Sequence, residues 1–146
     1  MSTDRRVDLV RTSRLQFTAT NARGGTLSFG SGDHGEFTPV ELLLVALAGC
    51  TGMDVDAITG KRAEADQFEL TATADKVRDE HGNHLTNIMI NFEVNFPDGE
   101  SGDAAEAVLP IAIRKSHDRL CTVTRTVQLP TPVTSTLRSA AVEGID

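Results

Sequence analysis

The sequence has few aromatic, sulfur-containing or basic residues. Its 146 residues include no Trp, no Tyr, six Phe and only two Cys. A core without larger aromatic groups must consist mainly of Leu, Val, Ile and Ala side chains. The net charge of −7 argues against nucleic acid as a main partner, because phosphate binding requires a basic surface. It also argues against binding to anionic membranes.

Long hydrophobic runs are missing as well. The longest, at residues 42–48, is too short to span a bilayer. The basic residues near the N-terminus are not followed by an apolar run, so we expect no signal peptide. We therefore expect a cytoplasmic protein that does not use a membrane as a partner. The length suits one domain, residues 1–146, with its own hydrophobic core.

The pattern of apolar residues predicts an α+β domain. Several stretches alternate with period two or are rich in β-branched residues, and two longer stretches have helical periodicity. The stretches at 68–75 and 88–96, separated by a polar turn, predict a β-hairpin. The expected strands are 7–10, 15–19, 26–29, 68–75, 88–96, 123–127 and 133–137, and the expected helices are 38–60 and 104–119.

The first expected helix has a clear start and an unusual middle. Thr38 and Glu41 form the pattern of a capping box, in which each side chain accepts a hydrogen bond from the other residue's backbone. The residues that follow are apolar on nearly every face, which predicts a centrally buried helix. Gly49 and Gly52 flank Cys50, and we expect them to permit the close approach of another backbone.

The two cysteines, Cys50 and Cys121, are the strongest candidates for chemistry. They are far apart in the sequence, so they can meet only through the fold. If they meet, they can act as a redox couple; if they do not, each is an inert core thiol. Because thiols are kept reduced in the cytosol, a cytosolic chain with two thiols favours the first interpretation.

The helix that carries Cys50 does not activate its thiol. Cys50 lies about three turns from the helix start, beyond the reach of the helix dipole, and Asp54 lies one turn further on the same face. Both an apolar environment and a nearby carboxylate raise a thiol pKa. We therefore expect a cation from the N-terminal strands to stabilise the thiolate, and the candidates are Arg11, Arg14 and Arg23.

Other catalytic or metal-binding patterns are weak. Glu41 could be a catalytic carboxylate, but nine residues place it roughly 180° around an ideal helix from Cys50, so capping is the better interpretation. His117 precedes Cys121 by four residues, but zinc needs more ligands than these two. The remaining histidines show no ligand spacing. We therefore expect no metal site and no cofactor.

Two segments resemble the OsmC/Ohr family of thiol-dependent peroxidases. The first is residues 38–55, with PVELLL and GCTGMD, and the second is residues 116–127, with SHDRLC. The resemblance implies an OsmC-like fold in which antiparallel sheets wrap around a central buried helix. It also implies an intertwined homodimer with two active sites at the subunit interface.

The resemblance also implies roles for individual residues. Cys50 would attack a small organic hydroperoxide and become a sulfenic acid, and Cys121 would resolve it as a disulfide. Arg14 would correspond to the family's arginine near the first strand, and Glu41 to its glutamate, one residue later than usual. An external dithiol, in some members a lipoylated protein, would reduce the disulfide. This implies a peroxide reductase in oxidative-stress defence.

The sequence departs from the well-studied peroxidases at two positions. Val40 stands directly after the helix-starting proline, where these often have glutamate, and Thr122 follows the second cysteine, where they often have proline. These features place the chain closer to the OsmC-like branch. Two alternatives therefore remain open: a non-catalytic stress protein that binds a small apolar ligand at the dimer interface, and a purely structural dimer.

Overall fold

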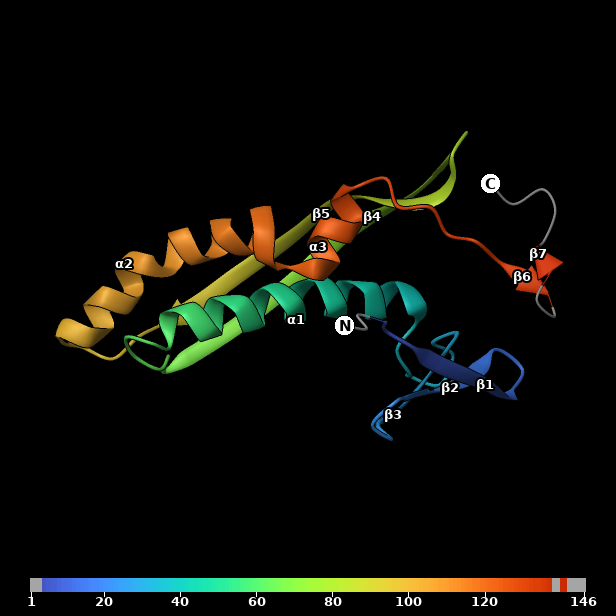
Figure 1. Ribbon diagram of the computed structural model, residues 1–146, viewed down its shortest axis with the longest axis horizontal. Coiled ribbons are helices and arrows are strands. Elements are labelled where there is room, and N and C mark those ends of the chain that lie inside the picture. The colour runs from blue at the N-terminus through green and yellow to red at the C-terminus, as the bar shows by residue number, and fades with distance from the viewer. Residues whose placement is uncertain (1–3, 138–139, 142–146) are drawn as a thin grey trace. The chain divides into compact units, whose positions relative to one another are not determined.

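The computed structural model describes residues 4–137 and 140–141 and has a mixed α+β fold with antiparallel sheets (Figure 1). This confirms the fold class predicted from the sequence. The chain divides into two compact units, residues 1–45 and 46–146, and the boundary falls inside the continuous helix α1 (Pro39–Thr59). The organisation as one domain stays a prediction. Residues 1–3, at the start of the segment predicted to lack a signal peptide, lie outside the described residues.

The first unit contains a three-stranded antiparallel meander. Its strands are β1 (Val7–Ser13), β2 (Gln16–Asn21) and β3 (Thr26–Gly30), paired in the order β1-β2-β3. Leu15 occupies the tight turn after β1 with a φ of 60°, a conformation that few residues other than glycine adopt. Phe17 and Phe29 pair across β2 and β3, and their stacked rings lie 6.0 Å apart. All three strands expected in this region are confirmed.

The loop between β3 and α1 is organised by one carboxylate. Glu36 accepts hydrogen bonds from the side chain of Gln16 at 2.8 Å and from the backbone N–H groups of Gly32 at 2.8 Å and His34 at 2.9 Å. These bonds, led by that from Gln16, lower the pKa of Glu36 from 4.5 to about 2. The carboxylate therefore stays charged at any ordinary pH and ties the loop to β2.

Helix α1 begins with the predicted capping box. The backbone N–H of Thr38 donates to the Glu41 carboxylate at 2.9 Å, and the N–H of Glu41 donates to the Thr38 hydroxyl at 3.2 Å. Two backbone donors that a helix start would otherwise leave unpaired are thus satisfied. The Glu41 side chain is therefore committed to holding the start of α1.

Helix α1 buries one stripe of its surface within the single chain. Residues spaced by four form this stripe: Leu47, Thr51, Val55 and Thr59. Other apolar residues of the helix, such as Val45 and Met53, are exposed. The expectation of burial on nearly every face is therefore wrong for the single chain, because most of the other apolar side chains of α1 are exposed or half-buried. By length and composition alone α1 is also long and apolar enough to cross a membrane, a test that core helices of soluble proteins pass as well.

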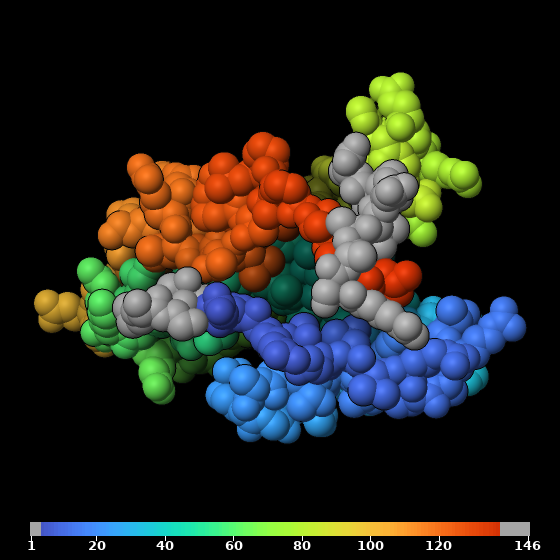
Figure 2. Space-filling view, turned by 45° about the vertical axis from the view of Figure 1, so that its right-hand side comes forward, coloured from blue at the N-terminus to red at the C-terminus, as the bar shows by residue number. Residues whose placement is uncertain are grey.

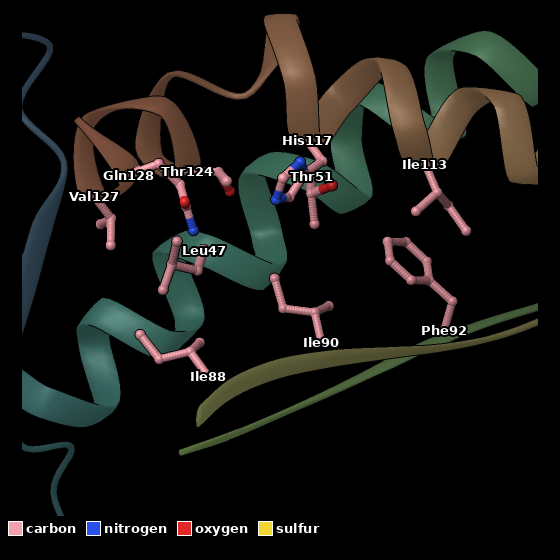
Figure 3. Close-up of a pocket in the computed structure, with 10 residues that line it drawn as sticks. All are labelled: Leu47, Thr51, Ile88, Ile90, Phe92, Ile113, His117, Thr124, Val127 and Gln128. Atoms are coloured by element: carbon pink, nitrogen blue, oxygen red, sulfur yellow. The ribbon is translucent and has the colours of Figure 1, made fainter. Parts of the chain in front are cut away.

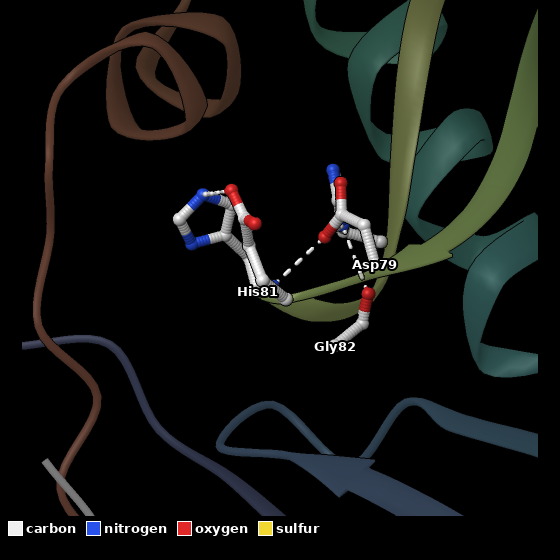
Figure 4. A network of polar contacts seen from close by, with 5 residues as sticks. Asp79, His81 and Gly82 are labelled. Carbon is white, nitrogen blue, oxygen red and sulfur yellow. Dashed lines mark hydrogen bonds and ion pairs between the residues drawn. The ribbon is translucent and has the colours of Figure 1, made fainter.

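The second unit contains the predicted hairpin, formed by β4 (Gln67–Asp79) and β5 (Gly82–Asn95). At its tight turn Asp79 accepts a hydrogen bond from the backbone N–H of His81 at 2.8 Å, and Gly82 has a φ of +88° (Figure 4). The yellow-green tip of the hairpin extends away from the orange helix α2 (Glu100–Lys115) (Figure 2). Leu70 of β4 packs against α1 at Gly52, where an added Cβ would lie 3.3 Å from the leucine side chain.

The last helical region confirms the helix expected at 104–119 and corrects the strand expected after it. Helix α2 continues through Pro110, which lies on its exposed face, and is followed by a π-helical turn, η1 (Ser116–Leu120). The strand expected at 123–127 is instead helix α3 (Thr122–Gln128). The sulfur of Cys121 caps this helix by accepting the backbone N–H of Thr124 at 3.3 Å, and the cap outweighs the strand preference of the Val and Thr residues.

The strand expected at 133–137 is mostly irregular chain. Only β6 (Thr136–Leu137) is a strand, and it pairs with β7 (Ala140–Ala141). Prolines at 130 and 132 precede it, and each removes a backbone donor and fixes φ, which shortens the run available for pairing.

Candidate functional site

The fold brings both cysteines together in the second unit. Cys50 and Asp54 lie one turn apart on α1, and Cys121 lies at the junction of η1 and α3. The two sulfurs and a carboxylate oxygen of Asp54 all lie within 4.8 Å of one another. Both cysteines are free thiols. The pair that could meet only through the fold therefore does meet, together with a carboxylate.

The π-helical turn places Cys121 at this site. The backbone N–H of Cys121 donates to the carbonyl of Ser116 at 2.9 Å, five residues back rather than four. Such wide turns interrupt regular helices and are frequent at functional sites. Cys121 then takes an extended conformation, with φ of −73° and ψ of 102°, and begins α3. The sulfur is thus held at the start of a new helix.

A chain of hydroxyl groups orients Asp54. The buried Ser116 hydroxyl donates to Oδ2 of Asp54 at 2.9 Å. The Thr51 hydroxyl lies 2.7 Å from the Ser116 oxygen, and since Ser116 gives its proton to the carboxylate, Thr51 is the donor. Two hydrogen bonds in series therefore fix the carboxylate on the side of the sulfurs. The sequence gives only a weak signal for this arrangement, because small hydroxyl residues are common in helices.

The environment of Cys50 disfavours its thiolate. Burial is the main reason that the pKa of Cys50 is raised above 9.0, and the neighbouring Cys121 thiol and Asp54 carboxylate act in the same direction. The backbone amide of Val123, in the first turn of α3, opposes them. This confirms that the local surroundings of Cys50 do not activate it and that Asp54 raises its pKa.

The two thiols differ in access to solvent. Cys121 is completely buried, and its sulfur already accepts a backbone hydrogen bond from Thr124. Cys50 is only half-buried. A reagent from solution therefore reaches Cys50 before Cys121.

An apolar pocket of about 200 Å³ adjoins the cysteine pair (Figure 3). Cys50 and Cys121 are not among its lining residues, but two residues that do line it connect it to them. Thr51 follows Cys50 in the chain, and the backbone N–H of Thr124 donates to the Cys121 sulfur. The pocket lies between α1, β5, the end of α2 and α3, and most of its wall is hydrocarbon. Its lining residues are Leu47, Thr51, Ile88, Ile90, Phe92, Ile113, His117, Thr124, Val127 and Gln128.

The comparison with protein families agrees with this architecture. Residues 30–136 match the family whose members are described as OsmC-like protein. The chain belongs to this family. The resemblance noted in residues 38–55 and 116–127 is thereby confirmed, and the matched region contains both cysteines and Asp54.

Relatives and solved structures support the OsmC-like assignment. An uncharacterized protein of Mycobacterium tuberculosis (strain H37Rv) is 31% identical over 124 residues, covering 84% of this chain and 88% of the relative. An OsmC-like protein of unknown function from Vibrio cholerae has a TM-score of 0.72 at 13% identity, covering 87% of this chain and 95% of that one. An organic hydroperoxide resistance protein OsmC from Legionella pneumophila has a TM-score of 0.54 at 13% identity, covering 86% and 89%. The two structures show that the fold is shared.

Two predicted site residues of this OsmC-like chain lie in its first unit. Arg14 is exposed in the turn between β1 and β2, and Glu41 belongs to the capping box of α1. Arg11 lies on β1 and Arg23 in the turn before β3, so all three candidate cations are in the first unit. Their roles beside Cys50 stay predictions.

His117 lies in η1 and lines the pocket rather than sharing a helix face with Cys121. Its ring Nδ1 lies 2.9 Å from the carboxylate of Asp118, an exposed contact that fixes the ring's outer edge. Figure 3 shows the His117 ring and the Thr51 side chain among the residues that line the pocket. His117 is therefore a wall residue of the pocket.

Proposed function

We propose that this OsmC-like protein is a thiol-dependent peroxidase that reduces organic hydroperoxides in oxidative-stress defence. One observation carries the proposal: the fold places the sulfurs of Cys50 and Cys121 within 4.8 Å of each other. The name of the Legionella pneumophila neighbour, an organic hydroperoxide resistance protein, supports the same class of reaction. We also propose that the protein acts in the cytoplasm, where a dithiol reductant is available.

In the first step the Cys50 thiolate attacks the outer oxygen of the hydroperoxide. The O–O bond breaks, the sulfur keeps the attacked oxygen as a sulfenic acid, and the alkoxide takes a proton to leave as an alcohol. Cys50 is assigned the attack because it is half-buried, whereas Cys121 is completely buried. The substrate is reduced by two electrons and Cys50 is oxidised by two.

In the second step the Cys121 sulfur attacks the sulfenic sulfur of Cys50. A disulfide forms and the oxygen leaves as water. An external dithiol then returns the two electrons by thiol–disulfide exchange, and a lipoylated protein is the proposed source. The short separation of the sulfurs supports direct resolution within one chain, without a second protein thiol.

The pocket beside the cysteines supports an organic rather than an inorganic peroxide. Its wall is mainly Leu, Ile, Phe and Val, and about 200 Å³ accommodates a small hydrocarbon group. Burying that group would add binding free energy in proportion to its apolar surface, at about 25 cal/mol per Å². Hydrogen peroxide has no such surface and would gain nothing from the pocket.

A cation is needed because burial, Cys121 and Asp54 all raise the pKa of Cys50. We propose that Arg14 supplies it, as the resemblance implies. A guanidinium would favour the thiolate and could also hydrogen-bond the peroxide oxygen as negative charge develops on it. Glu41 contributes through the start of α1, which sets the position of the helix that carries Cys50.

We further propose a homodimer that pairs the exposed stripe of α1. Val45, Gly49 and Met53 are spaced by four and lie opposite the buried stripe. Val45 is 51% exposed, Met53 is 76% exposed, and a Cβ added at Gly49 would meet no atom within 4 Å. An apolar stripe with a glycine at its centre suits close packing against a second helix. Cys50 lies at the edge of this stripe, so a partner subunit would approach the site.

The test is a peroxidase assay with purified protein, a dithiol and cumene hydroperoxide. The wild-type protein should consume the peroxide catalytically, and Cys50→Ser should remove the activity. Cys121→Ser should leave a sulfenic acid or a mixed disulfide on Cys50, detected by peptide mass spectrometry with a sulfenic-acid trap. Hydrogen peroxide serves as the comparison substrate and should react more slowly.

Glu106→Gln is the control, because it removes one negative charge from an exposed position on α2 that belongs neither to the pocket lining nor to the cysteine site. It should retain wild-type turnover. Full activity in Cys50→Ser, or no Cys50–Cys121 disulfide after treatment with one equivalent of cumene hydroperoxide, would contradict the proposal.

A second candidate is a non-catalytic protein that binds a small apolar ligand. The raised pKa of Cys50 and the apolar pocket favour it together, because a poorly ionised thiol reacts slowly while the pocket still binds. Native mass spectrometry of the purified dimer should then show a bound apolar molecule that persists in a variant lacking both cysteines. Slow alkylation of both thiols in the wild-type protein would accompany it.

A further inference from the structure

We propose that Cys50, Asp54 and Cys121 bind one zinc ion, with a fourth position open to water. The three ligand atoms come from two helical elements and lie within 4.8 Å of one another. This goes beyond the proposed peroxidase activity and departs from the expectation drawn from the sequence. The sequence pairs Cys121 with His117 by spacing, whereas the fold pairs it with Cys50 and Asp54.

The separations fit a tetrahedral ion after a small contraction. Zinc–sulfur bonds of about 2.3 Å and zinc–oxygen bonds of about 2.0–2.2 Å place tetrahedral ligand atoms about 3.5–3.8 Å apart. Ligand atoms that lie within 4.8 Å of one another in the metal-free chain must therefore close by at most about 1.3 Å to reach these separations. Rotations of the Cys50 and Asp54 side chains suffice for a change of this size.

The ligand set selects zinc over harder ions. Two thiolates and one carboxylate match the borderline-soft character of Zn²⁺, whereas Mg²⁺ and Ca²⁺ require oxygen ligands. Three protein ligands and one open position are the arrangement that zinc adopts where a water or another small ligand can still enter. The half-buried position of Cys50 provides access from solvent.

The surroundings already orient two of the three ligands. Ser116 donates to Oδ2 of Asp54, which leaves Oδ1 free to bind a metal, and Thr51 in turn donates to Ser116. The backbone N–H of Thr124 donates to the sulfur of Cys121. Hydrogen bonds of this kind fix the direction of metal ligands and are part of most metal sites.

Zinc binding and disulfide formation would exclude each other. Coordination replaces the two thiol protons by one Zn²⁺ ion and transfers no electrons, so the protons pass to the buffer. A disulfide leaves neither sulfur as a thiolate ligand. The same two sulfurs would then be either metal-bound and protected from peroxide, or metal-free and available for redox chemistry.

The experiment uses the full chain, reduced and stripped of metal, and titrates it with Co²⁺ as a spectroscopic probe of the zinc site. We expect one equivalent to produce intense sulfur-to-cobalt charge transfer in the near ultraviolet and visible bands typical of tetrahedral cobalt. Zn²⁺ should displace the cobalt stoichiometrically. The Cys50–Cys121 disulfide form of the same chain should produce neither signal, and this arm requires no substitution.

Variants distinguish the contribution of a metal ligand from that of the residues that orient it. Asp54→Asn should weaken Co²⁺ binding roughly tenfold or more, and Ser116→Ala should weaken it by roughly tenfold while keeping all three ligands. Asp56→Asn, with the same loss of charge on the same helix, should bind like wild type. Circular dichroism checks that each variant is folded.

Two results would overturn the zinc site. One is cobalt binding without sulfur charge transfer, and the other is equal affinity in Asp54→Asn and Asp56→Asn. Because the readout needs no peroxide, its failure is distinguishable from failure of the proposed activity. A protein that binds no zinc and still reduces cumene hydroperoxide would refute only this inference.

Discussion

Substituting Asp54 by Asn should make Cys50 a faster thiol at neutral pH. The substitution removes one negative charge and keeps an oxygen that can accept the hydrogen bond from Ser116. The local packing should therefore change little. Since the Asp54 charge is one of the causes of the raised pKa of Cys50, its removal should lower that pKa.

The size of this change in pKa follows from the distance between the Asp54 carboxylate oxygen and the Cys50 sulfur. A carboxylate oxygen within 4.8 Å of the sulfur contributes about 0.9 kcal/mol or more, even with the dielectric constant of water. The aqueous value applies because Cys50 is half-buried and Asp54 is the weakest of the named causes of its raised pKa. It corresponds to about a fourfold change in the thiolate fraction below the pKa. A less basic thiolate is also less nucleophilic, which reduces the expected gain in rate to about twofold.

The assay is alkylation by iodoacetamide across a range of pH, in metal-free buffer. Cys121→Ser serves as the background, so that Cys50 is the single thiol, and it is compared with the same variant carrying Asp54→Asn. Below the pKa the doubly substituted protein should react about twice as fast. Well above the pKa both thiols are fully ionised, so the order should reverse and the two profiles should cross.

Asp56→Asn in the same Cys121→Ser background is the control, and its profile should overlay that of the background alone. Unchanged alkylation in the Asp54→Asn protein would refute the placement of the carboxylate beside the sulfur. A slower reaction at neutral pH would refute the sign of the electrostatic argument.

Two further predictions concern the first unit and the proposed dimer. The Glu36 pKa is lowered in the folded chain, so its stabilisation of the loop is present above pH 4.5 and lost as the pH falls towards 2. The protection of the Gly32 and His34 amides from hydrogen exchange, measured relative to the intrinsic exchange rate at each pH, should therefore fall in that window, and it should be low at neutral pH in Glu36→Gln. Met53→Glu should weaken dimerisation by roughly tenfold or more in sedimentation experiments, because a charge would be buried between helices, whereas Met53→Leu should not. A dimer unchanged by Met53→Glu would place the interface elsewhere.

Much of the fold could be predicted because its signals are local. The capping box of Thr38 and Glu41 depends on residues three apart, and the hairpin depends on alternation within each strand. Helix α3 was predicted wrongly because its start depends on the sulfur of Cys121, a side chain that is not among the usual helix caps. Gly52 admits the side chain of Leu70 rather than another backbone. The sequence does not show which group packs against Gly52, because Leu70 reaches it only after the hairpin has packed on α1.

The cysteine site could be predicted only in part. The two cysteines were identified from the sequence as the candidates for chemistry. Asp54 was identified as a carboxylate that raises the pKa of Cys50, because it lies one turn further along the same helix. The sequence did not identify Ser116 or Thr51, which join the site through a π-helical turn that closes five residues back. Such a turn leaves no periodic pattern in the sequence, so the hydroxyl chain that orients Asp54 becomes visible only in the folded chain.

Asp54 connects the two proposals because its carboxylate affects them in opposite directions. Its charge disfavours the Cys50 thiolate in the metal-free chain, yet the same charge attracts a cation to the two sulfurs. Loss of the charge should therefore speed the reaction of Cys50 with an electrophile and weaken its zinc binding in the same protein. If the carboxylate served only to pack α1 against η1, the substitution would not raise the reactivity of Cys50 and lower its zinc affinity together. Opposite shifts in Asp54→Asn, with neither shift in Asp56→Asn, would thus identify a thiol site in which one carboxylate controls both the reactivity of Cys50 and its affinity for zinc.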